Sequence, residues 1–461
     1  MNEIEEENDE LDLHNAGSSS TNLSETAENG PMDQNIDSDG ETEMVLEEDD
    51  IRNDEQDEDL VFEEDLGNEL EIEEEHFVQQ SYKSLIAKDG TTWLNDLPSQ
   101  VIRTNAHNVF RGSAVGPTRA TQGLIESELF ELIITPTMLE QVLIDTNEKA
   151  QTTFQVWNDQ NPTKPKEWSN VTMMELRAAI GLFLLAGVNK SSDEDIDVLW
   201  SSESICYYRS AMSKSRFKEI LRFIRFDSQR TRAARLIDDK AAPISVLWEQ
   251  MNSNLRKYYN PSGEITVDEQ LFGYRGKTRF TQYIPSKPAK YGIKVWFACD
   301  ANSFYPLNSK IYTGKNANES RACNVGETVV KSLVHHWEKS GRTIVCDNFF
   351  TSLSLGRHLM SKGLALLGTV RQNKTFVPSE MKPSRERVEM SSVFGFLESK
   401  FSLVSYVPRK GKAVILLSTT PLNNTVVSNV KNKPQYILDY NATQGGVDTM
   451  DKMVSSYTTK R

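Results

Sequence analysis

The sequence has few cysteines, no long apolar run and almost no positive charge in its first 80 residues. Its four cysteines, Cys206, Cys299, Cys323 and Cys346, lie far apart and form no C-x-x-C pair. This spacing indicates neither a zinc module nor a disulfide framework. No apolar stretch approaches the ~20 residues that span a bilayer, and no N-terminal run is typical of a signal peptide. We therefore expect an intracellular protein with reduced thiols and no membrane segment.

Charge is divided unevenly along the chain. The sequence has 67 acidic and 51 basic residues, and residues 1–80 hold 31 of the acidic residues but only one basic residue. Residues 81–461 therefore hold 36 acidic and 50 basic residues, a net charge of +14. Residues 1–80 are too acidic and too poor in apolar residues to collapse, which predicts a disordered acidic arm. The basic remainder favours a polyanionic partner, most simply nucleic acid. The alternative is that the arm serves only solubility.

A length of 461 residues allows two or three domains. Residues 81–117 have mixed composition with isolated apolar anchors, which predicts an extended linker. Residues 118–263 are predicted to form a helical domain, because apolar residues recur at three- and four-residue spacing. The helical patterns cover residues 129–146, 173–188, 213–226 and 244–258.

The hydrophobic period changes after residue 263. Strand patterns at 264–271, 293–299 and 304–312 are followed by a helix at 327–339, a strand at 343–346, a helix ending at 360 and a strand at 364–370. Three strands in a meander, then alternating helix and strand, is the order of an α/β, RNase H-like core. Residues 264–374 form its first part and residues 434–461 its last. Residues 375–433 interrupt the core with further strand patterns, which predicts a β-rich insertion.

Three aspartates occupy comparable positions in these segments. Asp268 lies towards the end of the first strand, Asp347 follows the strand at 343–346, and Asp448 opens a predicted helix. Carboxylates at two strand ends and a helix start can converge on one point. Hard divalent cations such as Mg²⁺ bind carboxylate oxygens together with substrate phosphates, as in two-metal phosphodiester chemistry. The sequence therefore predicts a nuclease or strand-transfer site at which Asp268, Asp347 and Asp448 bind Mg²⁺ or Mn²⁺.

Two further acids flank these positions. Glu269 is expected on the opposite strand face from Asp268, because side chains alternate along a strand. It is therefore interpreted as a structural partner. Asp451 lies three residues after Asp448, on the same helical face. It is either a fourth, supporting catalytic carboxylate or a first-turn acid that favours the helix dipole.

Residues 274–294 combine positive charge with aromatic rings close in sequence to Asp268. Cations bind phosphates and flat rings stack on unpaired bases, so the segment predicts a DNA-binding surface. The alternative is an ordinary solvated hairpin with core aromatics. Arg371 and Lys374, which follow the strand at 364–370, are further candidates for contact with a DNA backbone. The complete set of predicted DNA-binding residues is Arg275, Lys277, Arg279, Lys287, Lys290, Lys294, Arg371 and Lys374.

Several sequence segments resemble motifs of the piggyBac family of DNA transposases and their domesticated relatives. The resemblance covers residues 118–461. It rests on the segments VDEQ (267–270), FGYRG (272–276), IPSKP (284–288), YGIK (291–294), CDNFF (346–350), GTVR (368–371) and GGVD (445–448). It implies a DDD catalytic core of Asp268, Asp347 and Asp448, with Asp451 as a frequently present fourth acid. It also implies cut-and-paste movement of DNA at TTAA targets through hairpinned transposon ends, by a homodimer. We accordingly expect a nuclear protein.

The resemblance leaves alternatives to an active transposase. Family members usually continue beyond the last catalytic helix with more helices and a cysteine-rich zinc-binding domain, whereas this sequence ends at Arg461. We therefore expect residues 434–461 to include the start of a truncated helical region. The alternatives are a domesticated DNA- or chromatin-binding protein without transposition activity, and an inactive transposon fragment.

Overall fold

The computed structural model describes residues 84–98, 109–112, 114–276, 278–285, 287–314 and 324–459. The chain divides into Met1–Glu47 and Glu48–Arg461, and every described residue lies in the second unit. The acidic arm predicted for residues 1–80 and the predicted DNA contact Lys277 lie outside the described residues.

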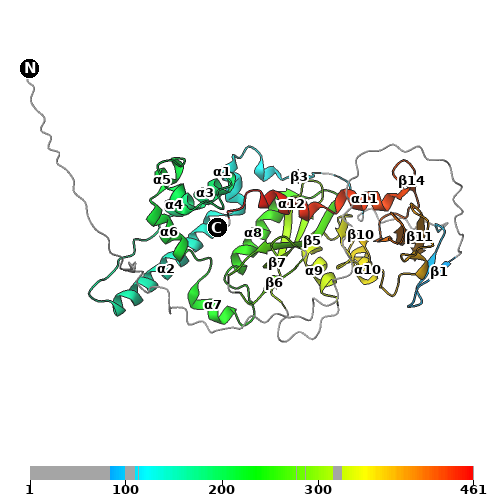
Figure 1. Ribbon diagram of the computed structural model, residues 1–461, viewed down its shortest axis with the longest axis horizontal. Helices are drawn as coiled ribbons and strands as arrows, with labels where there is room; N and C mark the ends of the chain where they lie inside the picture. Colours follow the sequence, from blue (N-terminus) through cyan, green and yellow to red (C-terminus); the bar gives the residue numbers. More distant parts are fainter. Residues whose placement is uncertain are drawn as a thin grey trace, which may run out of the picture. The chain divides into compact units, whose positions relative to one another are not determined.

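The described chain from Glu126 to Tyr258 is mainly helical (Figure 1). In α3 the side chain of Thr172 accepts a hydrogen bond from the backbone of Glu175, and the carboxylate of Glu175 accepts one from the backbone of Thr172. This reciprocal cap fixes where the helix begins. The helices of this part are α1 (Glu126–Ile133), α2 (Pro136–Gln160), α3 (Met173–Val188), α4 (Ile196–Leu199), α5 (Tyr207–Ala211), α6 (Lys214–Phe223), α7 (Gln229–Arg235) and α8 (Ser245–Tyr258).

The helix expected at residues 129–146 is two helices in the structure. Pro136 stands at the first position of α2, where its missing N–H costs nothing, and Thr135 caps the helix by accepting from Met138 N. The chain therefore breaks between α1 and α2, and α2 runs on to Gln160. The helix predicted at 173–188 has the same bounds as α3. Ser213 caps α6 by accepting from Arg216 N.

An 11-stranded sheet forms the centre of the remaining described chain. In β5, β7 and β8 neighbouring strands are antiparallel, and β9 lies parallel to both β5 and β10. The spatial order β8, β7, β5, β9, β10 thus has the three-strand meander on one side and the crossover strands on the other. The mixed α/β class predicted from the sequence is confirmed. The strands are β5 (Glu264–Gly273), β6 (Thr281–Tyr283), β7 (Tyr291–Asp300), β8 (Pro306–Ile311), β9 (Thr343–Cys346) and β10 (Ala365–Thr369).

Helices cover both faces of this sheet (Figure 1). On one face, α9 (Val325–Val334) and α10 (Leu353–Ser361) pack their apolar residues against Ile265, Val267 and Ile344. On the other face, α12 (Gly446–Ser455) packs against β7 through Val447 and Met450. α11 (Gln435–Thr443) covers Val345 and Leu367 on this same side. The sheet is therefore a middle layer with an apolar core on each side.

The residues inserted after β10 extend the same sheet. β11 (Ser392–Leu397), β12 (Phe401–Tyr406) and β13 (Val414–Ser418) form an antiparallel set, and β13 pairs with β10. At the far edge, β1 (Ser84–Ile86) and β2 (Thr92–Leu94) form a hairpin that pairs with β11. The fully buried Trp93 anchors it by donating to Phe376 O at 2.9 Å. Shorter paired strands are β3 (Gly116–Pro117) with β4 (Tyr259–Asn260) and β14 (Val426–Val427) with β15 (Lys433–Pro434).

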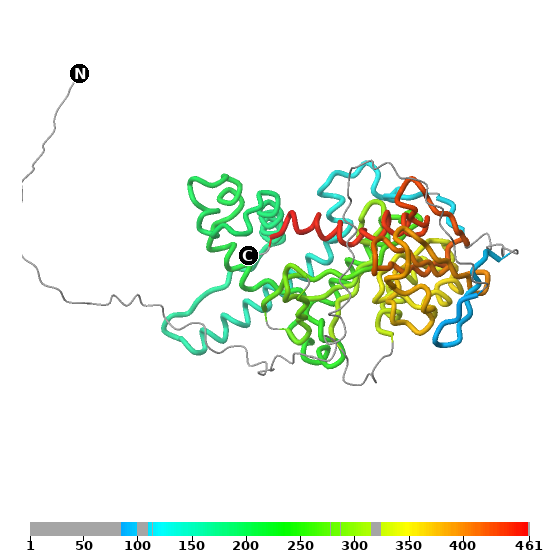
Figure 2. Tube along the Cα trace, turned by 45° about the vertical axis from the view of Figure 1, so that its right-hand side comes forward, coloured from blue at the N-terminus to red at the C-terminus, as the bar shows by residue number. Residues whose placement is uncertain are grey.

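Close backbone contacts hold α12 and the residues after it. Gly446 approaches Thr266 on β5 so closely that a Cβ there would lie 2.6 Å from Thr266 Oγ1. The chain then runs from the sheet to the N-terminal helices (Figure 2), where Tyr457 O lies against Gly187 of α3. The C-terminal helix thus connects the sheet to the helical region. Among the described residues, none of the helices combines the length and the apolar character that a bilayer crossing requires.

The fit of α12 against β5 can be tested with one methyl group. Gly446→Ala should lower the free energy of unfolding by about 1–3 kcal/mol, because the branched side chain of Thr266 cannot move aside. Gly181→Ala is a matched control, since Gly181 lies in α3 with nothing within 4 Å of its added Cβ. That control should raise stability by about 0.5–1 kcal/mol. Urea unfolding measures both, and an unchanged or raised stability of Gly446→Ala would contradict the close approach.

Candidate active site

Two of the predicted aspartates lie side by side because of how β5 and β9 pair. The parallel register aligns Val267 with Cys346, so Asp268 and Asp347 are the next residues on adjacent strands. Asp268 is paired with Phe297 on its other side, in β7. Both carboxylates are only partly exposed. The sheet therefore brings two acidic side chains to one place, as a metal- or proton-handling site requires.

The electrostatics of Asp268 reflect this crowding. Loss of surrounding water raises the pKa of its carboxyl well above the usual range, and the charges of Asp347 and Glu269 raise it further. A hydrogen bond from Glu269 N to Asp268 Oδ1 at 2.7 Å and the charge of Lys287 act in the opposite direction. Burial and like-charge repulsion dominate this balance. A bound cation would relieve both.

The turn after β9 holds Asp347 in place. Its Oδ1 accepts from Phe349 N at 3.0 Å, and its carbonyl oxygen accepts from the Thr351 hydroxyl at 2.7 Å. Gly368 on β10 leaves room for this hydroxyl, because a Cβ at that position would lie 2.2 Å from Thr351 Oγ1. Asp347 is therefore fixed by a tight turn.

The α12 helix brings the other two predicted acids to the same sheet face. Thr266, Asp268 and Gln270 alternate along β5 and so share one face. The hydroxyl of Thr266 donates to Thr443 O at 2.6 Å, at the end of α11, and the amide of Gln270 donates to Asp451 on α12. One hydrogen bond on each side of Asp268 thus holds the C-terminal helices against β5, the first at the end of α11 and the second on α12. Asp448, in its first turn, is exposed.

Lys287 connects the four acids electrostatically. Burial favours its neutral form, yet the charges of nearby acids prevail and raise the pKa of Lys287 above the ordinary value. Its Nζ also approaches Glu269 O at 3.5 Å. The acids that act on it are Asp268, Glu269, Asp448 and Asp451. Three of the four predicted catalytic acids therefore lie within the electrostatic reach of Lys287, and the fourth, Asp347, lies beside Asp268.

The neighbouring residue Glu269 has a structural role, as its place on the opposite strand face suggested. It forms an ion pair with Lys294 at 2.5 Å. The Lys294 ammonium also lies 5.3 Å from the ring centroid of Phe349. Lys294, predicted as a DNA contact, is thus already engaged by a carboxylate and a ring. It links β7 to the turn that holds Asp347.

The remaining predicted DNA contacts lie in two places. Arg371 Nε donates to Asn348 Oδ1 at 2.9 Å, directly after Asp347, and burial together with the charge of Arg371 lowers the pKa of Lys374. Arg371 therefore lies beside the turn that holds Asp347, and Lys374 lies near Arg371. Arg275, Arg279 and Lys290 are exposed at the end of the β5–β7–β6 ribbon.

Sequence reasoning missed two polar side chains at this site. Gln270 is 3 % exposed, and while its amide nitrogen binds Asp451, its Oε1 is buried without a partner among the described residues. Tyr440 on α11 is also buried, and its phenol has a raised pKa because of burial and the nearby charges of Asp347 and Asp268. The only available signal for Gln270 was its place two residues after Asp268 on the same strand face.

The donor chemistry suits a hard divalent cation, although the acids do not form a complete metal cage. Among the described residues, no group of three or more His, Cys, Asp or Glu side chains is arranged to hold an ion. Mg²⁺ is commonly bound through one or two carboxylates, with water and substrate phosphates completing its shell. The adjacent carboxylates of Asp268 and Asp347 meet that requirement. The acids on α12 are available to complete it.

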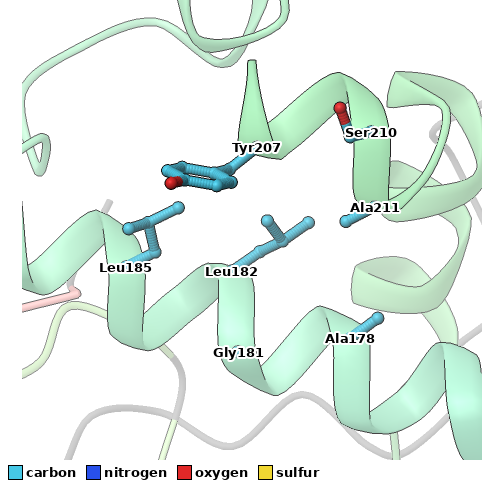
Figure 3. Close-up of a pocket in the computed structure, with 7 residues that line it drawn as sticks. All are labelled: Ala178, Gly181, Leu182, Leu185, Tyr207, Ser210 and Ala211. Atoms are coloured by element: carbon cyan, nitrogen blue, oxygen red, sulfur yellow. The ribbon is translucent and has the colours of Figure 1, made fainter. Parts of the chain in front are cut away.

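A shallow pocket elsewhere does not share this chemistry. It has a volume of about 550 Å³ and lies between α3 and α5, far in sequence from the aspartates (Figure 3). Its lining contains no charged side chain. The lining residues are Ala178, Gly181, Leu182, Leu185, Tyr207, Ser210 and Ala211. Such a surface can bind apolar groups but cannot transfer protons or hold a phosphate.

The crowding of carboxylates predicts a stability change that depends on pH. Because the pKa of Asp268 is higher in the folded chain, its contribution to stability falls as pH rises from the unfolded-state pKa through the folded one. Asp268→Asn should therefore raise the free energy of unfolding at pH 7 in metal-free buffer. The difference in free energy of unfolding between Asp268→Asn and the wild type should become smaller as the pH falls towards about 4.

Urea unfolding at several pH values measures this gain. Asp439→Asn, an exposed acid on α11, is the matched control and should show no such dependence. A variant Asp268→Asn that is less stable than the wild type at pH 7 would mean that Lys287 outweighs the repulsion.

Comparisons with known proteins place the chain in a family. The profile of a family described as transposase IS4 matches residues 126–461. A cryo-EM structure of a piggyBac transposase synaptic complex with hairpin DNA is 33 % identical and superposes with a TM-score of 0.68, covering 74 % of this chain and 71 % of that one.

Two curated human relatives are more distant in sequence. PiggyBac transposable element-derived protein 3 is 26 % identical over 48 % of this chain and 39 % of its own length. PiggyBac transposable element-derived protein 2 is 22 % identical over 63 % of this chain and 51 % of its own length. The chain thus spans about half or less of these relatives. The resemblance drawn from the sequence motifs is confirmed: the chain belongs to the transposase IS4 family, among the piggyBac transposases and piggyBac-derived proteins.

Proposed function

We propose that this chain is the core of a DNA transposase that cuts and joins DNA strands with Mg²⁺ or Mn²⁺. The observation that carries the proposal is the pair Asp268 and Asp347, which adjacent parallel strands hold together although burial and mutual repulsion oppose it. Folding alone gains nothing from such a pair. Asp448 on α12 is proposed as the third acid of a DDD site, and Asp451 as a supporting one.

Each residue has a separate task in this mechanism. Asp268 and Asp347 would hold the cations, and Asp448, in the first turn of α12, would contribute a third carboxylate. Mg²⁺ or Mn²⁺, when bound there, polarises the scissile phosphate and lowers the pKa of the attacking water. Lys287 balances the negative charge of the acids and lies where a phosphate would approach. Gln270 positions Asp451, and through it α12, by a hydrogen bond.

The finer features of the proposal come from the family. TTAA targets, hairpinned transposon ends, a homodimeric assembly and a nuclear location are all proposed for this chain on that ground. The related transposase was determined as a synaptic complex with hairpin DNA, which supports DNA as the partner. The net charge of +14 in residues 81–461 and the exposed cations of the β5–β7–β6 ribbon support it independently.

A second function is compatible with the same site. The curated relatives are named as transposable element-derived proteins. Such a protein can retain the fold and bind DNA or chromatin without moving it. A chain in which Lys287 remains paired with the acids when DNA is bound would behave in this way. The two functions differ in whether the carboxylates are needed for an observable reaction.

Cleavage of labelled DNA ends separates the two functions. Asp268→Asn and Asp347→Asn should each abolish Mg²⁺-dependent cleavage of a duplex that carries a transposon end and a TTAA site. DNA affinity should stay intact or rise slightly, because each change removes one negative charge from a site that faces phosphates. Gel analysis of the products and fluorescence anisotropy measure the two quantities on the same samples.

The control is again Asp439→Asn, which changes an exposed acid outside the site and should cut DNA like the wild type. The wild-type chain should be assayed alone and mixed with a full-length family member, in case end recognition requires a partner. If the wild type cuts no DNA in either format with Mg²⁺ or Mn²⁺, the transposase proposal fails. The DNA-binding function then takes its place.

A further inference from the structure

Two exposed tyrosines face each other across the end of the ribbon that carries Asp268. Tyr291 on β7 is paired with Tyr283 on β6, and their ring centroids lie 4.6 Å apart. On the other side of β7, Tyr274 N donates to Tyr291 O at 3.2 Å, so the chain of β5 continues the same row. The three tyrosines thus follow one another across β6, β7 and the residue that directly follows β5, and Figure 1 shows where these strands lie.

These rings are not part of an apolar core. Tyr274, Tyr283 and Tyr291 are 38 %, 37 % and 46 % exposed, and none packs against the hydrophobic clusters formed by the described residues. Gly276 lies against the Tyr274 ring, since a Cβ there would lie 2.2 Å from the Tyr274 hydroxyl. The ribbon therefore presents flat aromatic surface to solvent where polar side chains would be cheaper to expose.

The charge around the rings has one sign. Arg275, Arg279 and Lys290 are exposed next to the tyrosines in sequence. The loop between Tyr283 and Tyr291 also carries Lys287, whose ammonium reaches the carboxylates. Exposed rings among exposed cations suit a ligand that is both aromatic and anionic.

The row lies on the same sheet face as Asp268. Asp268 is paired with Phe297, and Phe297 and Tyr291 are both odd-numbered positions of β7, which therefore share a face. Six residues separate them, which corresponds to at most about 20 Å along the strand. At the stacked spacing of about 3.4 Å per nucleotide, a DNA strand with a phosphate at Asp268 covers that length with about six nucleotides.

We propose that Tyr283 and Tyr291, with Tyr274 beside them, form a stacking surface for unpaired bases of the DNA strand that leaves the carboxylate site. The inference rests on the proposed function, and it adds a subsite for single-stranded DNA at a defined separation from the scissile phosphate. Stacking on an aromatic ring tolerates any base, so the subsite selects unpaired structure rather than sequence.

Binding measurements on the full chain test the subsite without any need for cleavage. The probes are a blunt duplex and the same duplex with a thymidine flank of about ten nucleotides, in buffer without divalent cations. Tyr291→Ala should weaken binding of the flanked duplex about ten-fold, the usual loss for one stacked base, and leave the blunt duplex unchanged. Tyr291→Phe should bind both like the wild type, because the ring remains.

Tyr457→Ala is the matched control, since Tyr457 is 60 % exposed on the C-terminal segment and should affect neither probe. A 2-aminopurine placed along the flank should show a fluorescence change on binding that is largest four to eight nucleotides from the cleavage position and lost in Tyr291→Ala. Equal losses on both probes, or no loss on either, would overturn the proposal. Tyr283→Ala must repeat the result, which excludes a folding defect of one variant.

The outcome is separable from that of the proposed function. If the chain cuts no DNA but still requires Tyr291 to bind the flanked duplex, the subsite proposal stands and the transposase proposal fails. A chain that cuts DNA and binds both probes independently of Tyr291 and Tyr283 keeps the transposase and loses the subsite.

Discussion

The parallel pairing of β5 with β9 is the constraint on which the rest of the site depends. It aligns Val267 with Cys346 and so places Asp268 and Asp347 side by side, at a cost that burial and like charge both increase. Neighbouring parts of the structure offset or accommodate that cost. The turn after β9 binds one oxygen of Asp347, and Lys287 brings a positive charge to the acids.

The second constraint is the docking of α12, which decides whether Asp448 can join the pair. Thr266 lies two residues before Asp268 and Gln270 two residues after it, on the same face of β5. Both form hydrogen bonds with the C-terminal helices. Gly446 makes the approach possible because there is no room for a side chain against Thr266. A carboxylate on a helix is therefore positioned by a strand that carries another of the acids. This coupling explains why β5 alone contributes so much to the site.

The sequence was informative where a short segment determines its own structure, and less so where distant segments meet. Asp347 and Asp448 could be proposed from local signals, a strand end and a helix start, and the structure has both. Asp268 was also expected towards a strand end, but β5 continues to Gly273, so Asp268 lies in the middle of the strand. Alternation along β5 placed Glu269 away from Asp268, and the structure pairs it with Lys294. By contrast, the bond from Gln270 to Asp451 joins residues 181 apart, and no local pattern specifies it. The same limit applies to the pairing of β13 with β10, since a strand pattern does not reveal its neighbour.

The central claim is that Asp268, Asp347 and Asp448 form one metal-dependent site when DNA is present. Binding of Mn²⁺ to the DNA-bound chain, measured by electron paramagnetic resonance, tests it most directly. We predict that Asp268→Asn, Asp347→Asn and Asp448→Asn each remove or strongly weaken the bound Mn²⁺ signal, that Asp451→Asn weakens it less, and that Asp439→Asn leaves it unchanged. If Asp448→Asn binds Mn²⁺ as well as the control Asp439→Asn does, the account is contradicted, because α12 would then contribute nothing to the site.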